Sequence, residues 1–202
     1  MLEEKIEQQL LRQRGQRSKP QNLYNMGCLS KLNKAILVDC DGGATGVAEM
    51  LLINMADIAT KSVADGIATI TLAADAKAVL VESNKKGVNA TEEIKQNDNA
   101  PTALTQAVTF TLYAKHVGGT WIVNQILNGS FLALVNYKTR EKRVFGYNYG
   151  MVLSSLSEDA NANGGFTTIT LSTPENVIGE MRLTFNGASY DSLRAAAIVT
   201  ES

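Results

Sequence analysis

The sequence contains few cysteine, histidine, proline and aromatic residues. These shortages exclude several classes of protein. Its 202 residues include 2 cysteines, 1 histidine and 3 prolines, and aromatic side chains make up 6%. The two cysteines, Cys28 and Cys40, are too few for a disulfide scaffold, and the single histidine, His116, leaves no zinc-ligand spacing. We therefore expect two free thiols, no metal, no cofactor and no histidine-based catalytic triad.

The sequence also lacks an excess of charge of one sign and any long apolar run. Nineteen Lys and Arg residues face twenty Asp and Glu residues, which argues against a dedicated DNA-binding domain. The longest apolar runs, Met50–Ile53 and Phe131–Val135, are far shorter than the roughly 20 residues of a membrane span. The first twenty residues are polar and charged, so we expect no signal peptide and synthesis in a cytoplasm.

Residues 2–14 consist of good helix formers and predict a helical arm. Leu2, Ile6 and Leu10 follow i, i+4 spacing in an otherwise polar segment, which makes a thin apolar stripe. Gly15 and Pro20 mark its end. We expect residues 1–20 to be an N-terminal arm and linker, either a frayed tail or an arm that orders on a neighbouring subunit, and residues 21–202 to be one β-rich domain.

Short alternating or apolar runs separated by Gly, Asn and Asp dominate the chain after Pro20 and predict strands. Val108, Phe110 and Leu112 alternate with threonine and tyrosine, which indicates sheets with one buried and one polar face. The expected fold class is mainly β, an antiparallel sandwich or barrel. The expected strands are 35–39, 47–54, 67–72, 76–82, 107–115, 131–137, 143–147, 151–156, 167–172 and 178–186.

Three segments depart from the strand pattern. Gly119–Asn128 has helical spacing and predicts one short helix. Lys85–Pro101 and Ser157–Gly165 are rich in Asn, Asp, Gly and charged residues and are expected to be long exposed loops that contact a partner.

One apolar run ends in acidic residues and resembles an enzyme motif. Asp39 and Asp41, after Ala35–Val38 and before two glycines, resemble the first motif of haloacid-dehalogenase-type phosphatases, in which the first carboxylate attacks phosphorus. The later acidic pair of that family and its covering helices are not recognisable. A Gly-rich turn is the simpler interpretation of Asp39–Gly43, and we expect no enzyme.

The second half of the chain has a recognisable order of strands and turns. Phe131–Val135 leads to a basic turn, Glu141–Met151, that contains the sequence Arg-x-Phe-Gly; Gly164–Leu171 and a closing strand, Glu180–Phe185, follow. This order resembles the tail tube proteins of tailed bacteriophages. The glycines after Asp39-Cys40 and the run Val47–Asn54 resemble, more weakly, the opening hairpin of such proteins in phages of gut Bacteroides-type bacteria.

The resemblance implies a tail-tube-type sandwich with an α-helix on its side, a homohexameric ring, and stacked rings that form the tail tube of the virion. The partners would be further copies, other tail proteins, and double-stranded DNA that passes without specific binding. Lumen-forming strands are expected at Val47–Asn54 with Ile67–Leu72. Expected interface residues are Leu2, Ile6, Leu10, Lys85, Lys86, Glu92, Glu93, Lys138, Arg140, Lys142 and Arg143.

Other interpretations stay open. The basic cluster around Lys138–Arg143 is also consistent with a solvated hairpin turn. The chain is also compatible with another virion component, such as a head-to-tail joining ring, a tail terminator or a capsid decoration protein, because one fold serves several such roles. A phosphatase that uses Asp39 and Asp41 is the remaining alternative.

Overall fold

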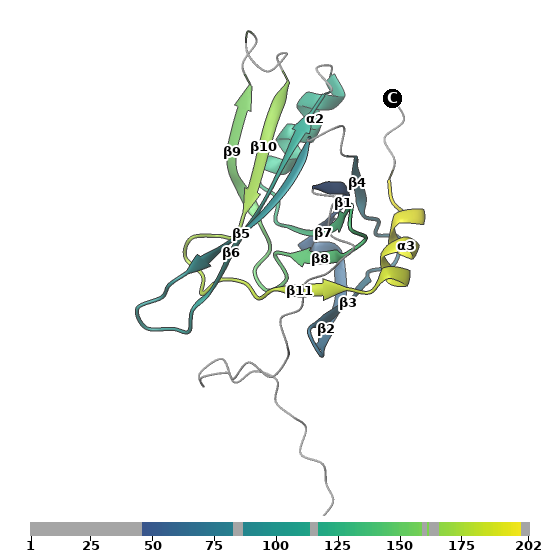
Figure 1. The fold of residues 1–202 in the computed structure, drawn as a ribbon. Helices are drawn as coiled ribbons and strands as arrows, with labels where there is room; N and C mark the ends of the chain where they lie inside the picture. Colours follow the sequence, from purple (N-terminus) through teal and green to yellow (C-terminus); the bar gives the residue numbers. More distant parts are fainter. Residues whose placement is uncertain (1–45, 83–86, 114–116, 159–160, 162–165, 199–202) are drawn as a thin grey trace, which may run out of the picture. The chain divides into compact units, whose positions relative to one another are not determined.

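Two β-sheets organise the chain (Figure 1). The structure is a computed structural model that describes residues 46–82, 87–113, 117–158, 161 and 166–198. The seven-stranded sheet has the order β2-β3-β11-β8-β7-β1-β4, and the four-stranded sheet has the order β5-β6-β10-β9. The fold is therefore mainly β, as the sequence predicts.

The elements have the following bounds. The seven-stranded sheet contains β1 (Val47–Asn54), β2 (Ile58–Ala64), β3 (Ile67–Leu72), β4 (Val79–Glu82), β7 (Phe131–Tyr137), β8 (Lys142–Phe145) and β11 (Leu183–Phe185). The four-stranded sheet contains β5 (Val88–Lys95), β6 (Ala103–Leu112), β9 (Val152–Glu158) and β10 (Thr167–Ser172). The helices are η1 (Met55–Asp57), α2 (Val117–Leu127) and α3 (Gly187–Ala195).

Strands β1 and β7 are neighbours inside the larger sheet, between β8 and the edge strand β4, and are covered on both faces. Met50 and Leu52 of β1 belong to the apolar core that both sheets share, whereas Leu51 and Ile53 belong to a second core on the opposite face. A strand buried on both sides needs apolar residues at successive positions. This is why the longest apolar runs of the sequence are these two neighbouring strands.

The core between the sheets explains the alternation in the smaller sheet. Val108 and Phe110 of β6 and Ile169 and Leu171 of β10 face the larger sheet and are buried. Helix α2 adds Ile126 to the same core. The smaller sheet is antiparallel throughout, while the larger is mixed, because β11 runs parallel to β3.

Helix α3 is attached to the second core and was not expected from the sequence. Its Tyr190 is fully buried there. The side chain of Asn186 caps the helix by accepting a hydrogen bond from the backbone N–H of Ser189 at 3.2 Å. Arg194 in the last turn forms an ion pair with Glu49 of β1 at 2.8 Å.

The expected strand positions are confirmed to different degrees. Val47–Asn54, Ile67–Leu72, Phe131–Tyr137 and Thr167–Ser172 form strands with the expected bounds. The expected helix at Gly119–Asn128 forms as α2, shifted by one or two residues. The expected strand at 35–39 and the expected arm at 1–20 lie outside the described residues.

Two expectations for this part of the chain were wrong. Residues 88–95, expected within a long loop, form β5, because each residue of this strand pairs with β6. The expected strand at 178–186 is reduced to Leu183–Phe185. Gly179 interrupts it with a φ of +119°, a conformation that side chains rarely adopt in a strand.

Truncation of a core side chain should test the packing of β7. Leu134 is fully buried in the second core, so Leu134→Ala should lower the free energy of unfolding by about 2–5 kcal/mol. Urea unfolding followed by circular dichroism measures this change. Thr60→Ala, at an exposed position of the edge strand β2, is the control and should change stability by less than about 0.5 kcal/mol; equal effects of both variants would contradict the assigned core.

Candidate functional site

The outer face of the four-stranded sheet is the most distinctive surface in the described part of the chain. Residues opposite one another in antiparallel strands share a face of the sheet. The register places Thr109 beside Thr170 and Asn89, and Thr170 beside Ser155. The hydroxyl oxygens of Thr109 and Thr170 lie 3.0 Å apart and form a hydrogen bond.

The neighbouring rows of this face have the same composition. Each row crosses the sheet at right angles to its strands, and all of its members point away from the shared core. The outward set is Asn89, Thr91, Glu93, Lys95, Ala103, Thr105, Ala107, Thr109, Thr111, Val152, Ser155, Ser157, Thr168, Thr170 and Ser172. We call this set the hydroxyl face.

Charge is scarce on the hydroxyl face. Glu93 and Lys95 are its two ionisable members, and they carry opposite charges. Lys95, at the end of β5, donates hydrogen bonds to the backbone carbonyls of Glu175 at 2.7 Å and Val177 at 2.6 Å, which holds its ammonium at the strand end. The face therefore offers hydroxyl groups with almost no fixed charge.

Both edges of this sheet end in unpaired strands within the described residues. Strand β5 pairs only with β6, and β9 pairs only with β10. An edge strand presents backbone N–H and C=O groups that another chain can pair with. A sheet with one buried face, one polar face and two open edges can be continued by further copies on either side.

A cluster of polar side chains holds the two sheets together beside the shared core. Gln106 of β6 is fully buried. Its Nε2 donates to Glu92 Oε1 at 2.9 Å, and its Oε1 accepts from the backbone N–H of Gly146 at 2.9 Å. Glu92, whose side chain is only 6% exposed, also pairs with Arg143 of β8 at 3.3 Å and with Arg182 at 2.6 Å.

A second buried carboxylate organises the turn after β8. Glu180 is 1% exposed, although alternation predicts a solvent-facing side chain. Its two oxygens accept the backbone N–H groups of Asn148 and Tyr149 at 2.8 and 2.9 Å. Burial raises the pKa of the Glu180 carboxyl above its ordinary value, and the two N–H groups oppose that rise.

The turn begins at Gly146, the glycine of the Arg-x-Phe-Gly sequence. Gly146 has a φ of +72°, and a Cβ there would lie 3.0 Å from the backbone oxygen of Phe131. The motif is thus explained by folding: Arg143 binds Glu92, Phe145 is fully buried, and Gly146 makes the turn.

The expected interface residues differ in their positions and contacts in the structure. Glu92 and Arg143 are paired with each other across the two sheets. Glu93 lies on the hydroxyl face. Lys138 and Arg140 are exposed in the turn between β7 and β8.

The remaining expected residues add little to the surface. The ammonium of Lys142 lies 5.5 Å from the centre of the Tyr190 ring. Several others lie outside the described residues. These are Leu2, Ile6, Leu10, Asp39, Asp41, Lys85 and Lys86.

The expectation that Val47–Asn54 forms a lumen stays a prediction. Strand β1 is buried between two cores and offers no polar face to a channel. Strand β3 has exposed Thr69 and Thr71 but lies between β2 and β11 within the larger sheet. The hydroxyl face was missed as a site, although the threonines at every second position of 105–111 and 168–172 signal it.

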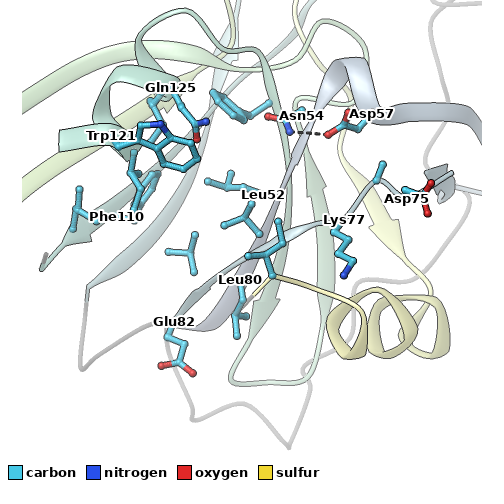
Figure 2. Close-up of a pocket in the computed structure, with 18 of the residues that line it drawn as sticks. Leu52, Asn54, Asp57, Asp75, Lys77, Leu80, Glu82, Phe110, Trp121 and Gln125 are labelled. Atoms are coloured by element: carbon cyan, nitrogen blue, oxygen red, sulfur yellow. Dashed lines mark hydrogen bonds between the residues drawn. The ribbon is translucent and has the colours of Figure 1, made fainter. Parts of the chain in front are cut away.

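An apolar groove lies between α2 and β4, where the two sheets diverge (Figure 2). Its volume is about 1160 Å³. Phe110 and Trp121 lie on one side and Leu52 and Leu80 on the other. The sequence did not predict the groove, because its walls come from distant segments.

The comparisons with known proteins add no family. No protein-family model matches the chain, and no curated protein matches it. Neither helix in the described ranges is long and apolar enough to cross a membrane. Among these same residues, no group of three or more His, Cys, Asp or Glu side chains is placed to hold a metal ion.

The buried carboxyl of Glu180 predicts a pH-dependent stability. The folded-state pKa is raised above the ordinary 4.5, so between the two pKa values the folded chain binds more protons than the unfolded chain, and stability falls as pH rises. Glu180→Gln removes this titration. The free energy of unfolding of the wild type minus that of Glu180→Gln should therefore fall as pH rises above 4.5 and level off above the raised pKa.

Urea unfolding of both chains across this pH range measures the difference. A difference between wild type and Glu180→Gln that rises with pH would contradict the assignment.

Proposed function

We propose that this chain is a virion structural protein of a tailed bacteriophage, which assembles into stacked homohexameric rings that form the tail tube. The proposal rests on the sequence resemblance and on one structural observation, the nearly uncharged hydroxyl face of a four-stranded sheet with two open edges. Copies joined edge to edge through β5 and β9 would close the sheet into a barrel.

In such a barrel the hydroxyl face would line the channel. The buried face of the sheet cannot do so, because it forms the core shared with the larger sheet. DNA carries one negative charge per about 1.7 Å of helix axis and binds Lys and Arg by releasing counterions. A wall of Thr and Ser side chains, in which Lys95 is bound to backbone carbonyls and Glu93 is acidic, would give DNA little to bind, so the genome could slide through.

The proposed work of the protein is done by shape and docking, without a catalytic step. Mainly antiparallel sheets also differ from the parallel, helix-covered sheet that the phosphatase resemblance implies. A joining ring or tail terminator remains the second candidate. It would use the same ring but would stop after one layer.

Electron microscopy of the purified chain should show the assembly directly. We expect hollow tubes of variable length with a regular axial repeat, because head-to-tail stacking contacts do not close. Single rings of one layer would favour a joining ring or terminator. A chain that stays monomeric at high concentration, and in the virion, would overturn the proposal.

A positive charge on the hydroxyl face should make the channel retain DNA. In Thr109→Lys, six or so ammonium groups per ring would face the duplex, so tubes assembled with DNA should protect it from nuclease at low salt and release it as salt rises. Tubes of the wild type should protect little. Thr60→Lys adds the same charge on β2 of the other sheet and is the control; equal protection by both variants would show that the hydroxyl face does not line the channel.

A further inference from the structure

The groove between α2 and β4 is an apolar feature in the described part of the chain that the proposed function leaves unexplained. Figure 2 shows Trp121 and Phe110 on one wall, with Leu52 and Leu80 on the other. Trp121 is 62% exposed, which is unusual for a tryptophan beside a core. An exposed apolar surface of this kind marks a site of interaction.

The size and shape of the groove favour a polypeptide over a small molecule. Its volume of about 1160 Å³ is above the roughly 300–1,000 Å³ of typical small-molecule sites. One wall is a helix, α2, and the other is the short edge strand β4. A groove with apolar walls is the usual receptor for one face of an amphipathic helix.

The rim of the groove is acidic. Asp57, Asp75 and Glu82 contribute three carboxylates, and Lys77 contributes one ammonium. Asp57 accepts a hydrogen bond from Asn54 at 2.7 Å, which leaves its charge unneutralised. A segment that combines an apolar stripe with basic residues would complement both the floor and the rim.

Residues 2–19 of this chain combine an apolar stripe with a net positive charge, because five basic residues outnumber Glu3, Glu4 and Glu7. Leu2, Ile6 and Leu10 form the stripe that the sequence predicts, and in a helix these eight steps would cover about 12 Å. The four residues of β4, which form one wall, span about 10 Å, so the stripe can run along the whole of this strand. The basic residues that follow, with no acidic residue among them, are Arg12, Arg14, Arg17 and Lys19.

We propose that the groove of one copy binds residues 2–14 of another copy, with the apolar stripe on Trp121 and the basic end at the acidic rim. The proposal rests on the proposed function, since it needs many copies held together. Each docked arm would then link two copies beyond their sheet contacts and strengthen the assembly by multivalency.

Trp121 is the chain's sole tryptophan, so its fluorescence reports on the groove directly. In the full-length chain, emission should shift to shorter wavelength as concentration rises and arms dock. Ile6→Asp places a charge in the stripe and should abolish this shift. Gln8→Asp adds the same charge about 200° away around the predicted helix and is the matched control, which should behave as the wild type.

Mixing two variants tests whether the arm comes from another copy. Trp121→Phe has an intact arm and no tryptophan signal, while Ile6→Asp has an intact groove and a defective arm. The mixture should regain the shift that Ile6→Asp alone lacks. A shift that is present in dilute monomer and is lost in Ile6→Asp without rescue would show docking within one chain, and would overturn the proposal.

Failure of the docking proposal and failure of the proposed function give different results. If tubes or rings form while Trp121 emission is the same in the wild type and in Ile6→Asp, the arm does not occupy the groove and the function stands. If sedimentation shows a monomer at every concentration and emission never shifts, both proposals fail. A shift that depends on concentration but is unchanged by Ile6→Asp would assign the groove to another segment and overturn this one.

Discussion

Burial of apolar side chains between the two sheets is the interaction on which the rest of the structure depends. The smaller sheet contributes alternate residues such as Val108, Phe110, Ile169 and Leu171 to that core. Because this sheet has one apolar face only, its other face is left for hydroxyl groups. Beside the core, Gln106 joins the two sheets by accepting a buried hydrogen bond from the backbone of Gly146. Its second bond, to Glu92 on the neighbouring strand, offsets the rest of the cost of burying a polar side chain.

The same constraint separates the two surfaces that carry the functional proposals. The hydroxyl face lies on the side of the smaller sheet that points away from the core, and the groove lies where the core opens between α2 and β4. One surface is polar with almost no charge, and the other is apolar with an acidic rim. The proposed channel lining and the proposed docking groove therefore differ in character, and Thr111 is the one residue that belongs to both.

Sequence periodicity predicted the strands whose residues are buried on a regular pattern. Both doubly buried strands, β1 and β7, and the alternating β10 were found with their bounds. Strand β5 was missed, because the inward position of Glu92 carries a carboxylate that becomes acceptable only beside Arg143, Arg182 and Gln106. The groove could not be predicted either, because its two walls come from segments that are far apart in the sequence.

The sequence by itself determined the local alternation of apolar and polar residues, and with it the β class and the existence of a threonine-rich face. These properties depend only on neighbouring residues, because successive side chains of a strand point to opposite faces. Only the tertiary structure decided which strands are neighbours, and that Glu92 and Arg143, expected at an interface between copies, pair within one chain across 51 positions. Such pairings depend on how two sheets meet, and a local pattern of residues carries no information about that.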